Sequence, residues 1–386
     1  MTVLTGMPNY PEGKIFTGYG LFRNRSQIYK GVRICRVPLV PRGKGGGVRL
    51  ALNYVSFALS SCMMAPFLCR EKYDVIFVFE PSPITVCLPA LVMKILKKAP
   101  VLLWVQDLWP ESLSATGVIS NPKIINGVHR LVRFIYCGCD RVLVTSKAYF
   151  PSVIANGGKS SSLRYFPQSV ESLYRPIILN GNAPEHEILP NGFRVMFAGN
   201  IGAAQSFSTI LDAAEMLKQI SDIKFIIVGD GRLRQWVEDE INTRNLEKTV
   251  HLIGRHPLEM MPRFFSLADA LLVTLKKDPV FSLTIPGKVQ SYFACGKPVI
   301  AALDGEGSRI ISEAKAGVVC AAEDAAGLAG AVMEMYEMTQ DQRDAMGEAG
   351  LAYHNSNFDR VKLISQLEDW MKECAEEAEK VKNAHA

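Results

Sequence analysis

The stretch MFAGNIGAAQSFSTILDAAEML, residues 196–217, decides the fold class of this chain. Its apolar start predicts a buried strand, Gly199-Asn-Ile-Gly202 predicts a tight turn, and a helical period begins near Ser206. Glycines at such a turn let backbone N–H groups approach a phosphate, and the N-terminus of the helix adds a positive dipole. A single turn of this kind does not establish nucleotide binding, so its neighbours matter.

Three further stretches repeat the order of strand, glycine loop and helix. Gly229-Asp230-Gly231 closes an apolar run, and Gly254-Arg255-His256 closes another. In the segment 284–319, Lys288 lies in the first turn of a predicted helix, where a cation opposes the helix dipole unless it serves an anion. Because the ends of parallel strands meet at one edge of a sheet, these loops predict a binding crevice there. Arg234 stands where a dinucleotide fingerprint needs its third glycine, which disfavours an NAD-dependent dehydrogenase.

Strand-like and helix-like segments alternate along the whole chain, which indicates βαβ units and parallel sheets. An Asn-, Pro-, Glu- and Gly-rich segment without an apolar period separates two such series and predicts a linker. We therefore expect an α/β fold with an N-terminal domain over 1–176, a linker over 177–192 and a C-terminal domain over 193–338. Residues 339–386 are expected to form helices that pack back on the N-terminal domain. Strands are predicted at 32–37, 74–79, 101–106, 141–145, 194–198, 224–229, 250–253, 270–274, 298–301 and 317–320.

Charge is distributed unevenly between the two halves. Residues 1–175 carry 22 Lys and Arg against 8 Asp and Glu, whereas residues 176–386 carry 21 against 30. A basic half indicates an anionic partner, either a nucleic acid or a membrane surface or lipid pyrophosphate. The basic stretch 23–49 lacks the interleaved aromatics of a base-stacking platform, which favours the membrane. Apolar helices at 55–69 and 84–96 are interrupted by Pro66 and Pro89, so they fit either buried helices or interfacial docking.

The nine cysteines show no metal-ligand spacing, and buried free thiols in a reducing compartment are the simplest interpretation. The sequence starts without the pattern of a signal peptide. These features predict a cytoplasmic protein.

The order G-N-I-G, G-D-G, G-R and K-x-x-x-Y-x-A-C-G-K-P resembles the donor domain of retaining glycosyltransferases with the GT-B fold. It is most similar to family four (glycosyl transferases group 1), and the stretches at 3–19 and WVQDLWPES at 104–112 resemble enzymes of the WbuB/WcaI type. The resemblance implies two Rossmann-like domains that face each other across a cleft. It also implies transfer of an N-acetylated amino or deoxyamino sugar, such as N-acetyl-L-fucosamine, from a UDP-sugar. The implied acceptor is an undecaprenyl-diphosphate-linked sugar in surface polysaccharide synthesis, at the inner face of the plasma membrane and without a required metal or cofactor.

Family members place Arg and Lys on the first donor loop, and a pair of glutamates follows later. Asn200 and Gln205 occupy the first two places here, while Leu283 and Ser291 replace the glutamates. The resemblance therefore implies that Lys288 and the backbone amides of the loop neutralise more of the diphosphate charge than they do in other family members. It also makes Glu306 a replacement catalytic contact. Asp107 is the other candidate catalytic residue, with an N-cap or turn role before Pro110 as the alternative. The implied donor-binding residues are Gly199, Asn200, Gly202, Gln205, Asp230, Gly231, Arg255 and Lys288.

Relatives open with a strand, a glycine loop and a helix before the strand that holds Val3-Leu4-Thr5. We therefore expect an N-terminal domain that lacks its first βα unit, through either an upstream natural start or a truncated form of uncertain activity. Two other functions fit the sequence: a non-catalytic sugar-nucleotide-binding partner subunit and a UDP-sugar 2-epimerase. The stretch at 104–112 argues against the epimerase.

Overall fold

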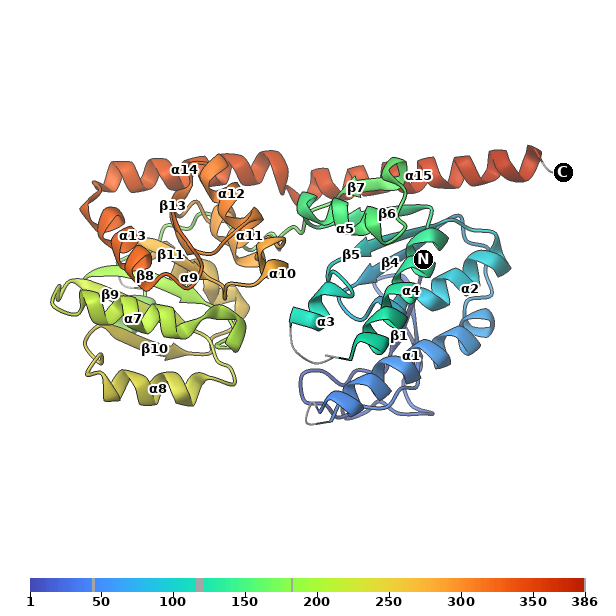
Figure 1. The fold of residues 1–386 in the computed structure, drawn as a ribbon, viewed down its shortest axis with the longest axis horizontal. Coiled ribbons are helices and arrows are strands. Elements are labelled where there is room, and N and C mark those ends of the chain that lie inside the picture. Colours follow the sequence, from blue (N-terminus) through green and yellow to red (C-terminus); the bar gives the residue numbers. More distant parts are fainter. Residues whose placement is uncertain (44–45, 116–120, 182, 385–386) are drawn as a thin grey trace. The chain divides into compact units, whose positions relative to one another are not determined.

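The computed structural model describes residues 1–43, 46–115, 121–181 and 183–384, which form two compact units (Figure 1). Unit 1 comprises Met1–Phe166 and Ser365–Ala386, and unit 2 comprises Pro167–Ile364. The boundary lies at Phe166 rather than at the predicted residue 176. Residues 339–364, which we expected to pack on the N-terminal domain, belong to unit 2.

Unit 2 contains a six-stranded parallel sheet in the order β10-β9-β8-β11-β12-β13. Counted from its first strand this is the order 3-2-1-4-5-6 of a doubly wound Rossmann sheet, in which the direction of strand addition reverses between β8 and β11 while all strands stay parallel. Ligands of such sheets bind outside the carboxyl ends of the strands at that reversal. The strands are β8 (Phe193–Ala198), β9 (Ile223–Val228), β10 (Val250–Gly254), β11 (Ala270–Thr274), β12 (Val299–Ala302) and β13 (Gly317–Cys320).

Helices cover both faces of this sheet and bury two separate apolar clusters. One cluster lies under α7, α8 and α13, and the other under α9, α11 and α12. The helices are α7 (Phe207–Leu217), α8 (Arg234–Thr243), α9 (Met261–Ser266), α10 (Pro279–Ser282), α11 (Gly287–Ala294), α12 (Glu306–Glu313), α13 (Ala325–Glu337) and α14 (Gln340–Asn357), with short 3-10 turns η4 (Ala203–Gln205) and η5 (Leu258–Met260).

The predicted linker over 177–192 contains a short helix, α6 (Glu185–Ile188), that is fixed to unit 2. Glu185 is buried, and its carboxylate accepts two hydrogen bonds from Arg263, one of them at 2.8 Å from Nη2 to Oε2. The composition of this segment predicted a linker, because composition does not reveal a bidentate ion pair with a residue remote in sequence.

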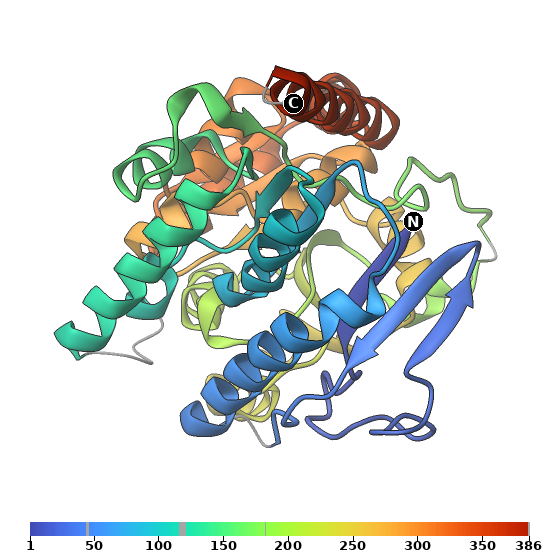
Figure 2. The same cartoon turned by 90° about the vertical axis from the view of Figure 1, so that its right-hand side faces the viewer.

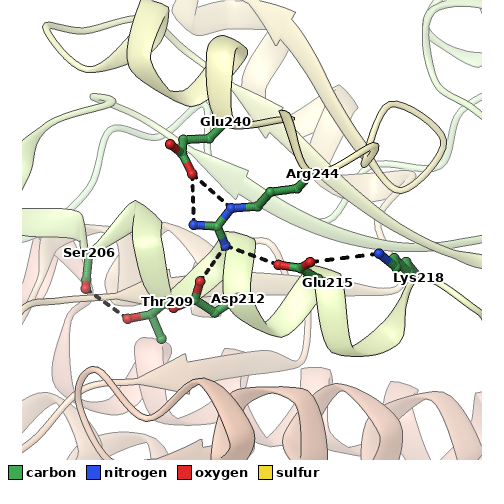
Figure 3. Close-up of polar contacts among 7 residues, drawn as sticks. All are labelled: Ser206, Thr209, Asp212, Glu215, Lys218, Glu240 and Arg244. Carbon is green, nitrogen blue, oxygen red and sulfur yellow. Dashed lines mark hydrogen bonds and ion pairs between the residues drawn. The ribbon is translucent and has the colours of Figure 1, made fainter. Parts of the chain in front are cut away.

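A charged network joins the helices that follow the first two strands (Figure 3). The guanidinium of Arg244, directly after α8, bonds to Glu240 of its own helix at 2.8 Å and to Asp212 of α7 at 2.5 Å. Glu215 lies 3.5 Å from the same guanidinium. The network holds α7 and α8 together, and both helices begin at the loops that form the candidate site.

Unit 1 has two sheets. In the first, β1 (Thr2–Gly6) pairs in parallel with β3 (Val32–Val37), which also pairs with the antiparallel β2 (Ser26–Tyr29). Among the strands that the structure describes, β1 pairs only with β3 and β4 only with β5. The second sheet is parallel, with the order β4 (Ile76–Glu80), β5 (Val101–Val105), β6 (Arg141–Val144) and β7 (Leu163–Tyr165).

Three helices of unit 1 lie side by side: α1 packs on α2, and α2 packs on α4 (Figure 2). The final helix, α15 (Arg360–Ala384), returns to unit 1 through Trp370, whose ring packs on Phe166, and through an ion pair of Glu377 with Arg141 at 2.7 Å. The helices of unit 1 are α1 (Gly47–Leu68), α2 (Leu88–Lys97), α3 (Glu111–Ala115), α4 (Pro122–Gly138) and α5 (Phe150–Ala155), with 3-10 turns η1 (Ile84–Cys87), η2 (Lys147–Tyr149) and η3 (Ser160–Ser162).

Candidate functional site

The loops after β8, β9 and β10 interlock through backbone hydrogen bonds. The N–H of Gly199 donates to Val228 O at 2.9 Å, and the N–H of Gly229 donates to Gly254 O at 2.8 Å. The N–H of Ile201 donates to Asp230 O at 2.8 Å. The three loops therefore form one continuous rim at the carboxyl edge of the sheet, beside the reversal between β8 and β11.

Glycine is required in this rim because the loops lie in direct contact. A Cβ on Gly229, whose φ is +146°, would lie 1.9 Å from Gly199 O. A Cβ on Gly231 would lie 2.3 Å from Ile201 O. Sequence reasoning assigned these glycines to phosphate approach. The structure adds another function for them, the packing of one loop on the next.

Lys288, the second residue of α11, reaches into this rim. A Cβ on Gly199 would lie 2.8 Å from Lys288 Cε, so the absent side chain leaves room for the lysine. Its Nζ lies 3.3 Å from the ring centroid of Phe197, a cation–π contact with a residue of β8. Part of the side chain reaches the surface, but Nζ itself is buried and has no hydrogen-bond partner among the described residues.

Burial without a partner lowers the pKa of Lys288 to about 7. Loss of hydration is the cause, because a charged ammonium loses more solvation free energy than a neutral amine does. A dianionic group at Nζ would restore the charged form and also compensate the dipole of α11. The electrostatics of this position therefore favour a phosphate ligand.

Tyr292, one turn further along α11, lies where β8 and β11 separate. These strands pair only at Ala270 and Leu271 of β11 within the described chain. Beyond that point the buried Tyr292 hydroxyl accepts from Ala198 N at 3.2 Å and donates to Leu272 O at 3.4 Å. The hydroxyl replaces inter-strand hydrogen bonds and fixes the strand end that leads directly into the Gly199 loop.

The other predicted donor-binding residues occupy the same rim. Asn200 and Asp230 are exposed, and Arg255 is exposed on the adjoining loop. The amide of Gln205 faces Asn200 O and Gly202 O, to which its nitrogen donates at 3.3 and 3.1 Å. Gly202 is buried at the start of the η4 turn that leads into α7. The structure thus gathers the predicted set around one edge of one sheet.

Glu306, the first residue of α12, is buried and already paired. Both of its carboxylate oxygens accept hydrogen bonds from Arg309, at 2.9 and 2.8 Å. The turn before it packs on the segment leading to α11, since a Cβ on Gly305 would lie 2.0 Å from Ser282 O. Glu306 is therefore held close to the start of α11, with Arg309 neutralising its charge.

Asp107 lies in unit 1, two residues beyond the end of β5. Its Oδ2 accepts from the indole N–H of Trp109 at 3.2 Å, and the same N–H lies 3.3 Å from Ser82 Oγ. Glu80 ends the neighbouring strand β4, is fully buried and has no hydrogen-bond partner for its carboxylate oxygens among the described side chains. Burial, reinforced by repulsion from Asp107, holds the pKa of Glu80 well above its usual range.

Comparison with known proteins identifies this arrangement. Residues 182–352 match the family of glycosyl transferases group 1. These residues form a glycosyl transferases group 1 domain, and the chain has the GT-B fold. The putative colanic acid biosynthesis glycosyl transferase WcaI of Escherichia coli K12 is 21% identical over 304 residues, which cover 76% of this chain and 73% of WcaI.

Solved structures at low identity share its fold. The structure of Anabaena HepE in complex with UDP and glucose gives a TM-score of 0.67 at 16% identity, with 89% of this glycosyltransferase and 86% of HepE covered. The alpha,alpha-trehalose 6-phosphate synthase of Burkholderia multivorans gives a TM-score of 0.70 at 13% identity, with 100% and 99% covered.

The sequence analysis assigned no role to two residues, Glu80 and Tyr292, although the motif K-x-x-x-Y contains Tyr292. Glu80 ends an apolar strand at the edge that also holds Asp107, and this shared position could have indicated it. Tyr292 falls at a buried position of a helix and reads as an ordinary core aromatic. The partners of its hydroxyl are backbone atoms of two strands remote in sequence, and no local pattern shows them.

Proposed function

We propose that this glycosyltransferase uses a UDP-sugar, with the diphosphate bound at Lys288 and the Gly199–Gly202 loop. The observation that carries the proposal is the buried Nζ of Lys288, which has no partner among the described residues and lies directly behind Gly199. A buried cation without a counter-ion is costly, and a phosphate removes that cost. The uridine diphosphate found with Anabaena HepE supports the choice of nucleotide.

We propose transfer of a hexosyl group with retention of configuration. The bond between the anomeric carbon and the diphosphate oxygen breaks, and the acceptor oxygen bonds to the same face of that carbon. The proton of the acceptor hydroxyl passes to the departing diphosphate. Lys288 and the backbone amides of the loop stabilise the negative charge that develops on UDP, without a protein nucleophile or a metal.

Asp107 and Glu306 are the proposed catalytic carboxylates. Asp107 would orient the acceptor or stabilise positive charge at the anomeric carbon. Its indole donor, Trp109, fixes the carboxylate in one orientation. Glu306 would contact the donor sugar while the guanidinium of Arg309 fixes its carboxylate in place.

The proposed acceptor is a lipid-linked sugar, and the proposed donor sugar is an N-acetylated amino or deoxyamino sugar. Sequence similarity to WcaI and the basic charge of residues 1–175 support a function in surface polysaccharide synthesis. The enzyme would then act as a peripheral protein on the cytoplasmic face of the membrane.

A transfer assay tests this function. Radiolabelled UDP-sugars are offered with undecaprenyl-diphosphate-linked sugars, and the product is separated by its lipid tail. Transfer of label from one UDP-sugar, with loss of transfer in Lys288→Met, is the expected result. Absence of transfer across the donor panel, alongside tight UDP binding by the same preparation, would reject the enzyme in favour of a sugar-nucleotide-binding subunit.

A further inference from the structure

The outer surface of α1 carries a continuous apolar stripe. Val48, Leu52, Val55, Leu59, Met63 and Phe67 follow one another at helical spacing, and each is between 52% and 79% exposed. Soluble surfaces scatter such side chains singly, whereas a contiguous stripe indicates a binding face. By length and composition this helix could also cross a membrane.

Polar side chains along one flank of the stripe fix α1 to unit 1. Asn53 is buried, donates to Val40 O at 2.6 Å and lies 3.4 Å from Arg42 Nε. Ser60 donates to Pro38 O at 2.6 Å, and Ser56 accepts from Val40 N. The buried side of α1 thus combines polar Asn53 and Ser61 with the small apolar Ala58 and Ala65, whereas the large apolar side chains of the stripe point outward. These bonds hold α1 flat on the domain.

The two helices beside α1 extend the same surface. Ile95 and Leu96 of α2 are 78% and 57% exposed, and Ile124 and Phe134 of α4 are 50% and 61% exposed. The three helices contact one another in the order α1, α2, α4 and lie side by side in Figure 2. We name this surface the α1–α2–α4 face.

Its charge is entirely basic. The sequences of α1, α2 and α4 contain no Asp or Glu. Arg49, Lys123, Arg130 and Arg133 are exposed on it, and Asp140, just beyond α4, is paired with Lys94 of α2 at 2.6 Å. An apolar stripe bordered by cations matches the chemistry of an anionic bilayer, in which acyl chains lie beneath phosphate headgroups.

We infer that the α1–α2–α4 face docks unit 1 on an anionic phospholipid bilayer, with α1 lying in the plane of the interface. The inference rests on the proposed function, since a lipid-linked acceptor presents its sugar at that surface. Beyond the proposed function, it names the face of unit 1 that binds the membrane and the charge of the lipid that this face binds. A bilayer fits this face better than a second copy of the chain, because two such basic surfaces would repel each other.

Co-flotation with vesicles tests the docking. The full chain is mixed with vesicles of phosphatidylethanolamine and phosphatidylglycerol, or with vesicles of phosphatidylcholine alone. Neither vesicle contains an acceptor lipid, so failure to dock is separable from failure of the proposed transfer. We expect flotation with the anionic vesicles only, weakened by added salt.

The variant Leu52→Glu, Leu59→Glu, Phe67→Glu should lower the vesicle partition coefficient at least about tenfold, because three inserting side chains become anionic. These residues are exposed, so the thermal midpoint and UDP affinity should not change. A matched control places the same three charges on exposed apolar residues of unit 2, Ile178→Glu, Met216→Glu and Val361→Glu, and should float like the wild type. Arg130→Gln with Arg133→Gln should lose the preference for anionic lipid while retaining the apolar contribution.

Three results would overturn the inference. One is equal flotation of the triple variant and the control. Another is the absence of wild-type flotation with either vesicle. The third is a shift of the triple variant from dimer to monomer in sedimentation analysis without any change in flotation, which would make this face a contact between copies.

Discussion

At the carboxyl edge of a parallel sheet in each unit lies a buried ionisable group, Lys288 or Glu80, with no side-chain hydrogen-bond partner among the described residues, and the two differ in sign. Lys288 in unit 2 has its pKa lowered to about 7, and Glu80 in unit 1 has its pKa raised well above the usual range. Burial therefore favours the neutral form in both cases. The difference lies in what restores the charge: a phosphate can do so for Lys288, whereas the nearby Asp107 carboxylate opposes it for Glu80.

This contrast separates the tasks of the two edges. The edge of unit 2 can recruit an anion, because a bound diphosphate recovers the charge of Lys288. The edge of unit 1 can hold a proton on Glu80 beside Asp107, a pair suited to hydrogen bonding with a hydroxyl. In a sugar transfer these are the needs of the donor and of the acceptor, respectively.

The largest expected effect belongs to Asp107→Asn. Removing its charge should lower the rate of sugar transfer about 100-fold to 1,000-fold, because transition-state stabilisation by a charged group is lost. UDP affinity, measured by calorimetry, should not change, since the donor rim belongs to unit 2. The control Asp74→Asn removes an exposed carboxylate of unit 1 and should retain the wild-type rate. If Asp107→Asn and Asp74→Asn transfer sugar at the same rate, Asp107 serves only the structure of its turn.

Lys288→Met should lower UDP affinity about 100-fold, the scale of a buried charge-assisted contact. It should also raise the free energy of unfolding by about 1–2 kcal/mol, because a desolvated amine leaves the folded state. Chemical denaturation and UDP titration measure the two quantities.

Lys297→Met is the matched control for that substitution. Lys297 is largely buried too, but its Nζ donates to Ser266 O at 2.8 Å and Ala268 O at 2.9 Å. Its removal leaves two carbonyls unpaired and should lower stability with little effect on UDP affinity. A loss of stability in both lysine variants would mean that Lys288 has a structural role rather than a ligand-binding one.

Tyr292→Phe removes one hydroxyl and should reduce UDP affinity about fivefold, with a loss of about 1–2 kcal/mol in stability from two unpaired backbone groups. Tyr353→Phe, whose hydroxyl donates to Glu313 at 3.2 Å on the surface, should change neither. An affinity unchanged in Tyr292→Phe, despite lower stability, would remove the hydroxyl from donor-loop positioning.

Glu80→Gln should have the smallest effect at neutral pH, because glutamine mimics the protonated carboxyl. A raised pKa in the folded state contributes stability that is lost as pH rises through that pKa. The wild type should therefore lose stability relative to Glu80→Gln as pH rises from the ordinary pKa of a glutamate to the raised pKa of Glu80, as measured in denaturation curves. If the free energies of unfolding of the wild type and Glu80→Gln change with pH in parallel, the folded protein does not hold the extra proton on Glu80. Glu71→Gln, an exposed change, controls for general charge effects.

Much of the fold was predictable because local signals agree with it. The predicted strands of both series are present, with ends shifted by one or two residues, since short apolar runs bounded by glycine or proline specify buried parallel strands. The missed strands β2 and β7 have only four and three residues, too short for a period. The unit boundary was misplaced because segment 167–176 joins unit 2 through contacts remote in sequence, such as the stacking of Tyr174 on Phe265.

The candidate site was predictable in its loops but not in its electrostatics. The order of glycine turns locates the rim, and the helix-dipole argument singles out Lys288. The stacking of Lys288 on Phe197 and its lack of a partner depend on packing that no linear pattern contains. The same holds for Glu80, whose burial follows from the elements packed over the end of β4.

Proton uptake on UDP binding tests the central claim most directly. Calorimetric titrations in two buffers with different ionisation enthalpies give the number of protons bound with the ligand. If Lys288 is half-neutral near pH 7 and charged in the complex, UDP binding at about pH 8.5 takes up close to one proton, with an affinity about tenfold lower than at about pH 7. Lys288→Met should take up none. Proton uptake of zero in the wild type, or equal uptake in the variant, would contradict the assignment of Lys288 as the buried cation that binds the diphosphate.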